Sequence, residues 1–348
     1  MKISQHIKTA AIVPVFNVEK YLEDCLSSLL RQTFPFNLII LIDDGSTDGS
    51  GTLCDDFAKS NDSIIVVHKE NEGLGLARNT GLEHVPDDID FVMFVDSDDW
   101  LELDAHETLT NCIDSSEIEC VTSGFVKRND HGRVLFTLEL EDKAWHREEI
   151  IGSLIPRICG SSPSLSDSIP MSVCATLFKK SVIDDADLKF VSEREVISED
   201  FDFKVKFLSR CSNVVTSSAL KYNYRFNPES LSTSYRPDRF NASLDFYDYA
   251  CELASSLGVC EECKTRLAKT MFIYVRSAFS QERSSISGLS FVQSCSNMAA
   301  MLCDRRLRAV VDKYPVNELG CKQRIFIICI RLKMVRILCF AAELGLLR

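Results

Sequence analysis

The chain has 348 residues, of which 45% are hydrophobic and 26% charged, so it is long enough to bury a sizeable globular core. Its formal net charge of −12 excludes a general nucleic-acid binder, because such a protein needs a basic face for phosphates. The 15 cysteines follow no disulfide framework and the N-terminus carries no apolar signal segment, so we expect reduced thiols in a cytoplasmic protein.

The first hundred residues alternate between short apolar strands and helices with one apolar face. The pattern predicts strands at 10–15, 38–42, 64–67 and 91–95, and helices at 22–30, 50–59 and 73–83. Continuously apolar strands are covered on both faces, and right-handed crossovers order them in parallel. We therefore expect a doubly wound, mostly parallel α/β sheet.

The rest of the chain is less regular. Strands are predicted at 118–127 and 134–140, a Ser- and Pro-rich loop at 153–170, a strand-to-helix segment at 172–183, a helix at 201–208, and almost only helix after 240. We expect one domain over 1–235, divided into halves at 103 and 104, and a helical C-terminal region over 236–348.

Two acidic clusters follow predicted strands. Asp43 and Asp44 come directly after the second strand, and Asp96, Asp98 and Asp99 come after the fourth. Ligands of open α/β sheets bind at the carboxyl ends of the strands, and carboxylates at such an end suit Mg²⁺ or Mn²⁺. A single D-x-D is equally typical of an acidic turn, but two clusters at strand ends favour a binding site.

These clusters belong to four motifs that occur in order. They are Pro14-Val15-Phe16-Asn17, Asp43-Asp44-Gly45-Ser46-Thr47-Asp48, Ala77-Arg78-Asn79-Thr80-Gly81 and Asp96-Ser97-Asp98-Asp99. Together they closely resemble family 2 glycosyltransferases of the GT-A fold, over roughly residues 10–103. The resemblance implies a GT-A sheet, a nucleotide-sugar donor with uridine diphosphate (UDP) favoured, a divalent metal and inversion at the sugar carbon.

The resemblance assigns donor contacts to the first three motifs. Pro14 and Phe16 would line the nucleobase pocket, and the pair Asp43 and Asp44 would face the base, with Asp44 accepting a hydrogen bond from it. Arg78 would approach the base or the phosphates; a surface ion pair is the alternative for that residue, and both stay open.

The fourth motif would hold the ribose on Asp96 and Mn²⁺ or Mg²⁺ on Asp98, with Asp99 sharing either task. Further on, Tyr222-Asn223-Tyr224-Arg225 resembles a segment that closes over the diphosphate, which makes Arg225 the expected cation there. Asn227 stands where the family has a second basic residue, which leaves that assignment incomplete.

An acidic pair matches the family's acceptor side. In Glu199-Asp200-Phe201 the resemblance makes Asp200 the catalytic base. The alternative is that Asp200 caps the helix that it opens. Upstream, Thr176 replaces a lysine that the family usually has, so acceptor contacts there are in doubt.

The C-terminal residues 322–348 carry six cations and one carboxylate among apolar residues. Charges at 331, 333 and 336 exclude a conventional spanning helix. An interfacial helix at the inner face of the cell membrane is one interpretation; a helix packed on its own protein or on a second copy in a homodimer is the other.

The combined hypothesis is an inverting glycosyltransferase that moves a sugar to a glycan or lipid-linked glycan hydroxyl, in polysaccharide or other cell-surface glycan synthesis. A nucleotidyltransferase is the alternative enzyme, but its basic, Gly-rich triphosphate loop is absent near the first strand. A non-catalytic nucleotide-binding scaffold of the same fold is the third reading.

Overall fold

The structure, a computed structural model, describes residues 6–227, 235–283 and 287–347. It divides into two compact units, one formed by 1–155 with 170–228 and the other by 156–169 with 229–348. The predicted domain boundary at 235 lies close to the second of these divisions. The segment 156–169 packs with the C-terminal unit, which its position in the chain does not indicate.

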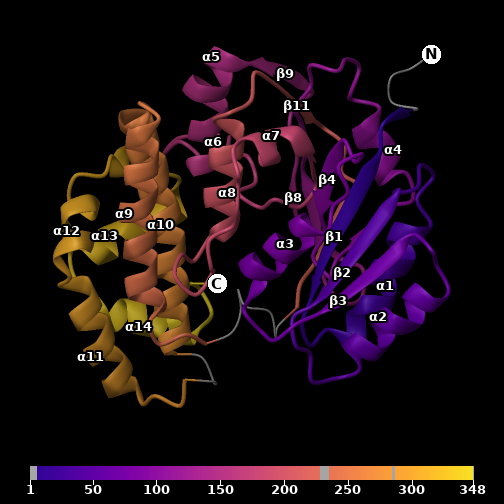
Figure 1. The fold of residues 1–348 in the computed structure, drawn as a ribbon. Coiled ribbons are helices and arrows are strands. Elements are labelled where there is room, and N and C mark those ends of the chain that lie inside the picture. Colours follow the sequence, from indigo (N-terminus) through magenta and orange to yellow (C-terminus); the bar gives the residue numbers. More distant parts are fainter. Residues whose placement is uncertain (1–5, 228–234, 284–286, 348) are drawn as a thin grey trace. The chain divides into compact units, whose positions relative to one another are not determined.

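The first unit is built on an eight-stranded sheet (Figure 1). In spatial order its strands are β3 (Ile64–His68), β2 (Leu38–Asp43), β1 (Thr9–Val15), β4 (Phe91–Phe94), β10 (Thr176–Lys179), β6 (Cys120–Ser123), β11 (Asn213–Ser217) and β9 (Lys143–His146). The first four strands are parallel, β11 pairs in parallel with β6, and β10 and β9 run antiparallel to their neighbours. The predicted mostly parallel α/β sheet with C-terminal helices is confirmed.

The helices of this unit cover both faces of the sheet (Figure 1). They are α1 (Glu19–Leu30), α2 (Ser50–Lys59), α3 (Leu74–Glu83), α4 (Ala105–Thr110), α5 (Arg147–Glu149), α7 (Lys180–Asp185) and α8 (Glu199–Leu208), with a π-helical segment η2 (Ile150–Leu154) after α5. The next helix, α6 (Ile155–Cys159), begins where the chain passes into the second unit. Alternate residues of β1 point to opposite faces. Val13 packs into the core with Leu22 and Leu26 of α1, whereas Ile12 lies against Gly81 of α3.

A second, four-stranded sheet lies beside the end of β4. Its order is β5 (Trp100–Leu101), β12 (Tyr222–Arg225), β7 (Phe125–Arg128) and β8 (Val134–Leu138). The prediction of one strand over 118–127 was wrong, because the chain passes from the first sheet to the second at Gly124. A side-chain carbon there would lie 1.8 Å from the carbonyl oxygen of Leu138, so only glycine permits this crossing.

The C-terminal unit is helical and has a core of its own. Its helices are α9 (Arg239–Ser256), α10 (Cys260–Glu282), α11 (Phe291–Leu302), α12 (Arg305–Val311), α13 (Cys321–Arg331) and α14 (Val335–Glu343), with a 3₁₀ turn η3 (Val316–Glu318). Met271, Phe279, Leu302 and Leu338 are buried together in this core. Within the described residues, none of the helices combines the length and the apolar character that crossing a membrane requires.

Two local predictions differ from the structure. The loop expected over 153–170 begins with helical turns, since η2 and α6 extend to Cys159. The single C-terminal helix expected over 325–347 is two helices, α13 and α14, because Lys333 between them has a φ of +52° that ends the first helix.

Candidate functional site

The acidic motifs meet at the carboxyl edge of the main sheet. Val15 of β1 is paired with Asp43 of β2, and the amide of Asp44 donates to the carbonyl of Val15 at 2.9 Å. β4 pairs in parallel with the other side of β1 and ends at Phe94, two residues before Asp96. Parallel pairing therefore brings the first, second and fourth motifs to one edge, as the sequence predicted.

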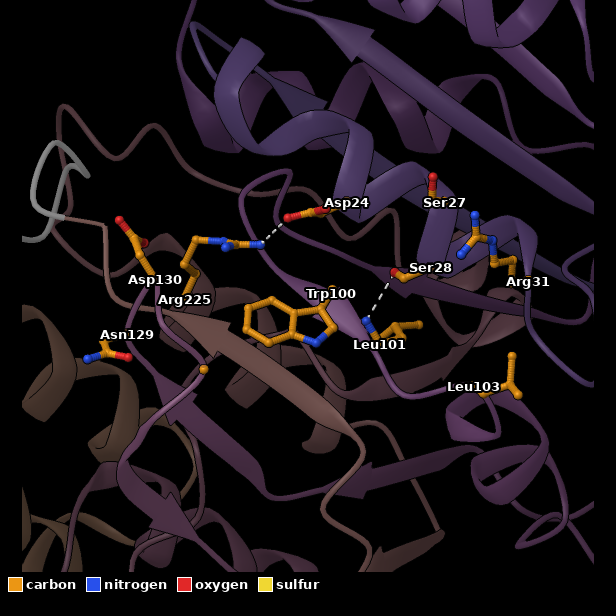
Figure 2. Close-up of a pocket in the computed structure, with 11 residues that line it drawn as sticks. Asp24, Ser27, Ser28, Arg31, Trp100, Leu101, Leu103, Asn129, Asp130 and Arg225 are labelled. Atoms are coloured by element: carbon orange, nitrogen blue, oxygen red, sulfur yellow. Dashed lines mark hydrogen bonds and ion pairs between the residues drawn. The ribbon is translucent and has the colours of Figure 1, made fainter.

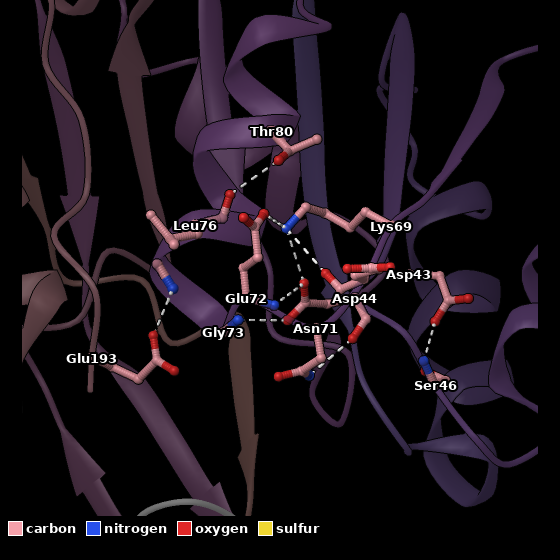
Figure 3. Close-up of polar contacts among 12 residues, drawn as sticks. Asp43, Asp44, Ser46, Lys69, Asn71, Glu72, Gly73, Leu76, Thr80 and Glu193 are labelled. Atoms are coloured by element: carbon pink, nitrogen blue, oxygen red, sulfur yellow. Dashed lines mark hydrogen bonds and ion pairs between the residues drawn. The ribbon is translucent and has the colours of Figure 1, made fainter.

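Asp44 organises the loop that leads into α3 (Figure 3). Its carboxylate accepts the backbone N–H of Gly73 at 2.8 Å and of Glu72 at 3.1 Å, and the ammonium of Lys69 lies 3.2 Å away. The side chain is almost completely buried. Gly45 follows it with a φ of +75°, and a side-chain carbon there would lie 2.9 Å from the amide nitrogen of Asn71. The contact of Asp44 with a nucleobase stays a prediction.

The other residues assigned to the nucleotide differ in exposure. Asp43 is buried, accepts the amide of Ser46 at 3.0 Å and lies 2.8 Å from Nδ1 of His68, whose pKa Asp43 and Asp55 raise through hydrogen bonds. Pro14 lies buried in β1. Phe16 projects beyond the end of β1 with 47% of its surface exposed, which leaves an aromatic ring free to stack on a planar ligand.

Arg78 lies at the centre of the site with only 1% of its surface exposed. Its guanidinium donates to Asp96 at 2.9 Å, to Glu199 at 2.9 Å and to Asp200 at 2.6 Å. The ring of Phe190 lies 5.3 Å from the guanidinium carbon. Arg78 thus forms an ion pair, as one of the two sequence interpretations proposed, but a buried one; its contact with base or phosphates stays a prediction.

This network joins residues 121 and 122 positions apart in the chain, since Arg78 is on α3 and its partners Glu199 and Asp200 begin α8. One cation faces three carboxylates there, so the cluster carries excess negative charge. Burial, together with the charge of Asp200, raises the pKa of Glu199 to about 8. Glu199 consequently holds a proton near neutral pH and acts as a neutral partner of Arg78.

Asp200 is positioned by contacts outside its own helix. One carboxylate oxygen accepts Arg78, and the other accepts the backbone N–H of Val173 at 3.2 Å. Ser198, not Asp200, occupies the residue position that precedes the first turn of α8, so the capping alternative is wrong. The Asp200 side chain keeps 18% of its surface exposed, which leaves one edge open to an incoming group.

Lys204 is a site residue that the sequence analysis missed. It lies one turn after Asp200 on α8, is fully buried, and donates to the carbonyl of Ser172 at 2.8 Å. It also reaches Thr122 at 3.3 Å and Thr176 at 3.4 Å, which brings an ammonium group beside the residue that replaces the family's lysine. Burial lowers the pKa of Lys204 to about 8. The sequence feature that could have identified Lys204 is its position four residues, or one helical turn, after Asp200 in a segment rich in phenylalanine.

The Asp96–Asp99 loop is held from behind by β12. Asp99 is fully buried and accepts the hydroxyl of Tyr222 at 2.6 Å and the backbone N–H of Arg225 at 2.8 Å. Burial and the charges of Asp96 and Asp98 raise the pKa of Asp99 well above its usual range. Both of its oxygens accept hydrogen bonds from the protein and the side chain is fully buried, and its contact with a metal stays a prediction.

The guanidinium of Arg225 is held by the protein. It donates to the carbonyl of Asp98 at 2.8 Å and to the carboxylate of Asp24 at 2.9 Å, and its guanidinium carbon lies 4.5 Å from the centre of the Trp100 ring. A diphosphate contact of Arg225 stays a prediction. Asn227, which stands in place of the second basic residue, donates to the carboxylate of Asp98 at 3.1 Å.

No three metal-ligating side chains gather in the described part of the chain. Asp96 and Asp98 each keep one carboxylate oxygen without a hydrogen-bond partner among the described residues. Burial and the charge of Asp96 raise the pKa of Asp98. This partly buried pair of like charges is the part of the site that a cation would stabilise.

The comparisons with known proteins agree with one another on the family that this chain resembles. The family model described as Glycosyl transferase family 2 matches residues 10–166. Glycosyltransferase GlyA of Streptococcus pneumoniae is 30% identical over 251 residues, which cover 72% of this chain but only 35% of GlyA. The uncharacterized glycosyltransferase EpsJ of Bacillus subtilis is 29% identical over 263 residues, covering 72% of this chain and 74% of EpsJ. Proteins of minor teichoic acid biosynthesis in Bacillus subtilis also match over about a third of this chain.

Among solved structures, TarS 1–349 of S. aureus in complex with UDP-GlcNAc is similar to this chain with a TM-score of 0.60. The alignment covers 97% of this chain and 92% of that one at 21% identity. At this level of identity the likeness shows the fold.

Removing the central cation should destabilise the protein. We expect Arg78→Gln to lower the free energy of unfolding by about 3–5 kcal/mol at neutral pH, because the partly buried carboxylates of Asp96 and Asp200 lose their cation and the buried Glu199 loses its hydrogen-bond donor. The loss should shrink as the pH falls, since protonation neutralises those carboxylates more readily in the folded variant than in its unfolded chain. Denaturant unfolding at several pH values measures both effects.

The control for this experiment is Arg133→Gln, which removes an exposed guanidinium of the same unit. It should leave the free energy of unfolding within about 0.5 kcal/mol of the parent. An Arg78 variant as stable as this control at neutral pH would contradict the central role of the ion network.

Proposed function

This chain belongs to glycosyl transferase family 2, and we propose that it transfers a sugar from a UDP-sugar to an acceptor hydroxyl with inversion at the sugar carbon. The observation that carries the proposal is the Arg78 network, which ties Asp96 after β4 to Asp200 on α8. Asp96, which is assigned to the donor, and Asp200, the candidate base, are thereby joined in one ion network. The relatives with names from teichoic acid biosynthesis support a cell-surface glycan as the product.

The donor nucleotide is assigned to the edge formed by β1 and β2. Phe16 offers an exposed aromatic face there, with Asp43 and Asp44 on the neighbouring strand end. TarS, whose fold this chain shares, was solved with UDP-GlcNAc and with UDP, which supports a uridine nucleotide as the donor carrier. The identity of the sugar is left open by this reasoning.

A divalent cation fits the carboxylates after β4. Asp98 and Asp96 each present an oxygen atom without a partner in the described part of the chain, and the oxygens of a donor diphosphate would complete the kind of ligand set that Mg²⁺ and Mn²⁺ prefer. When bound, such a cation supplies charge neutralisation for the departing diphosphate. The chain's own part is to fix Asp98, which Arg225 and Asn227 do through its carbonyl and carboxylate.

We expect Asp98→Asn to abolish sugar transfer and to weaken UDP binding only when Mn²⁺ or Mg²⁺ is present. The amide removes the charge that attracts the cation but keeps the size of the side chain. UDP affinity, measured by calorimetry with and without metal, checks this. If the wild-type protein binds UDP equally well with and without metal, the proposed metal role is wrong. A non-catalytic scaffold, in contrast, would show no metal-dependent turnover.

Asp200 is the proposed general base. Its carboxylate is held between Arg78 and the amide of Val173 and keeps a solvent-facing edge. From that edge it can take the proton of an acceptor hydroxyl while the hydroxyl oxygen attacks the sugar carbon opposite the leaving diphosphate. Lys204 supports this geometry indirectly, because it binds the carbonyl of Ser172 next to Val173.

Replacing this base should remove transfer and leave the donor bound. We expect Asp200→Asn to retain UDP affinity and to lose transfer by about 10²–10⁴-fold, which is the usual contribution of a general base. Rates and UDP affinity are measured on the same purified variant, with a melting curve as the folding control.

Glu199→Gln is the matched control, because it alters the neighbouring contact with Arg78. A pKa of about 8 makes Glu199 largely protonated at neutral pH, and glutamine resembles that neutral form. This variant should keep most of its transfer rate. If Asp200→Asn transfers within a few-fold of wild type while Glu199→Gln does not, the base is Glu199.

We also propose that the C-terminal helices bring the enzyme to an anionic lipid surface. On α13 and α14 the exposed apolar residues recur at helical spacing: they are Ile325, Ile328, Leu332, Ile337, Phe340 and Leu344. Lys322 and Arg336 lie among them and have no hydrogen-bond partner in the described chain, whereas Arg331 binds backbone carbonyls. Cations beside exposed apolar residues are typical of an interfacial surface, and a lipid-linked acceptor at the inner face of the cell membrane would lie within its reach.

Membrane binding is best tested with point variants, since Ile330 and Leu338 of these helices belong to the core of the unit. Lys322→Gln with Arg336→Gln should weaken flotation with anionic vesicles at low salt, by about 1 kcal/mol per cation. Leu332→Ser with Phe340→Ser should weaken it at low and high salt. Val292→Ser, an equally exposed apolar position on α11, is the control. Equal recovery of all variants with lipid would exclude this surface and favour a homodimer contact.

A further inference from the structure

A cavity of about 420 Å³ lies in the first unit beside the second sheet (Figure 2). Its walls come from α1, from β5, from the turn between β7 and β8, and from Arg225 of β12. The residues that line it along α1 run from Asp24 to Arg31, about 10 Å of helix at 1.5 Å per residue. Apart from Arg225, none of the residues assigned to donor, metal or base lines it.

Trp100 forms the aromatic wall of this cavity (Figure 2). The guanidinium of Arg225 lies over its ring and fixes the orientation of the indole, and the ring remains partly exposed. Its N–H has no hydrogen-bond partner among the described residues. A partly exposed, immobilised indole with a free donor suits a ligand that has both apolar C–H faces and polar edges.

The remaining walls offer both donors and acceptors. The Ser27 hydroxyl, the Arg31 guanidinium and the Asn129 side-chain amide N–H groups have no partner among the described residues, while Asp24 and Asp130 supply carboxylate oxygens. Both carboxylates are already paired with a cation, Asp24 with Arg225 and Asp130 with Lys20, so they offer acceptor oxygens without a free negative charge. Hydroxyl groups of a sugar can both donate to and accept from this lining.

We infer that this cavity is a binding subsite for a neutral oligosaccharide, the glycan that the enzyme extends. The inference rests on the proposed glycosyltransferase function and adds to it a second place where acceptor is held, away from the donor edge. Arg225 connects the two places, because the guanidinium that covers Trp100 also binds the carbonyl of Asp98. Glycan in the cavity thus contacts the residue that fixes the proposed metal loop.

The experiment uses three neutral disaccharides as probes: cellobiose, lactose and diacetylchitobiose, each at millimolar concentration without donor. Saturation-transfer NMR on the full chain reports which of them bind. We expect at least one disaccharide to show saturation transfer from the protein. Its dissociation constant should be raised about tenfold or more in Arg31→Ala. The control is Arg133→Ala. Arg133 lies on the turn between β7 and β8 but is not one of the residues that line the cavity, so this variant should bind the disaccharide as the parent protein does.

Trp100 provides an independent readout. The chain has two tryptophans, and Trp145 is buried, so a disaccharide should alter the emission of Trp100 alone. Trp100→Phe should abolish that optical change. The inference is overturned if no disaccharide shows saturation transfer, or if Arg31→Ala and Arg133→Ala bind equally. Disaccharide binding without any sugar transfer from UDP-sugars would overturn the proposed function alone, and transfer without disaccharide binding would overturn this inference alone.

Discussion

The site depends on one buried charge. Arg78 cannot lose its proton, so a position with 1% exposure is tolerable only with carboxylates around it. Asp96, Glu199 and Asp200 meet that need, and in doing so the end of β4 and the start of α8 are fixed relative to each other. The same contacts leave more negative than positive charge in the cluster, and burial together with the charge of Asp200 raises the pKa of Glu199 to about 8. Stability and the geometry of the candidate base are thus parts of one constraint.

A second constraint acts on the loop after β4. Three carboxylates within four residues, those of Asp96, Asp98 and Asp99, would repel one another if all faced the same solvent pocket. β12 separates them: Tyr222 and the backbone of Arg225 bind Asp99 inside the protein, and Asn227 binds Asp98. Asp96 turns toward Arg78 instead. Asp99 is therefore an internal anchor of the loop, whereas Asp96 and Asp98 each keep one oxygen without a hydrogen-bond partner among the described residues.

The two units differ in how many of their reactive or apolar side chains are already engaged by other parts of the protein. In the first unit most charged groups of the site are paired with protein, so the open positions are few and well defined: the Phe16 ring, the edge of Asp200 and the lining of the Trp100 cavity. In the C-terminal unit the core is apolar and complete, yet α13 and α14 still expose apolar residues in regular rows. Surfaces of that kind indicate an interaction rather than a requirement of folding.

The sequence by itself determined the sheet of the first hundred residues and the edge at which the acidic motifs meet, because strand periodicity and parallel order depend on local patterns. It also marked Asp200 as a candidate base and predicted a helical C-terminal region. Only the tertiary structure decided which of those carboxylates are bound by other protein groups, that Arg225 stacks on Trp100, and that Lys204 supports the loop beside Asp200. It also decided the crossing at Gly124 and the break before α14. These features arise from contacts between residues up to 201 positions apart, such as Arg225 with Asp24. A charged side chain has the same local signature whether its partner is solvent, a ligand or another part of the chain, so only the folded arrangement distinguishes them.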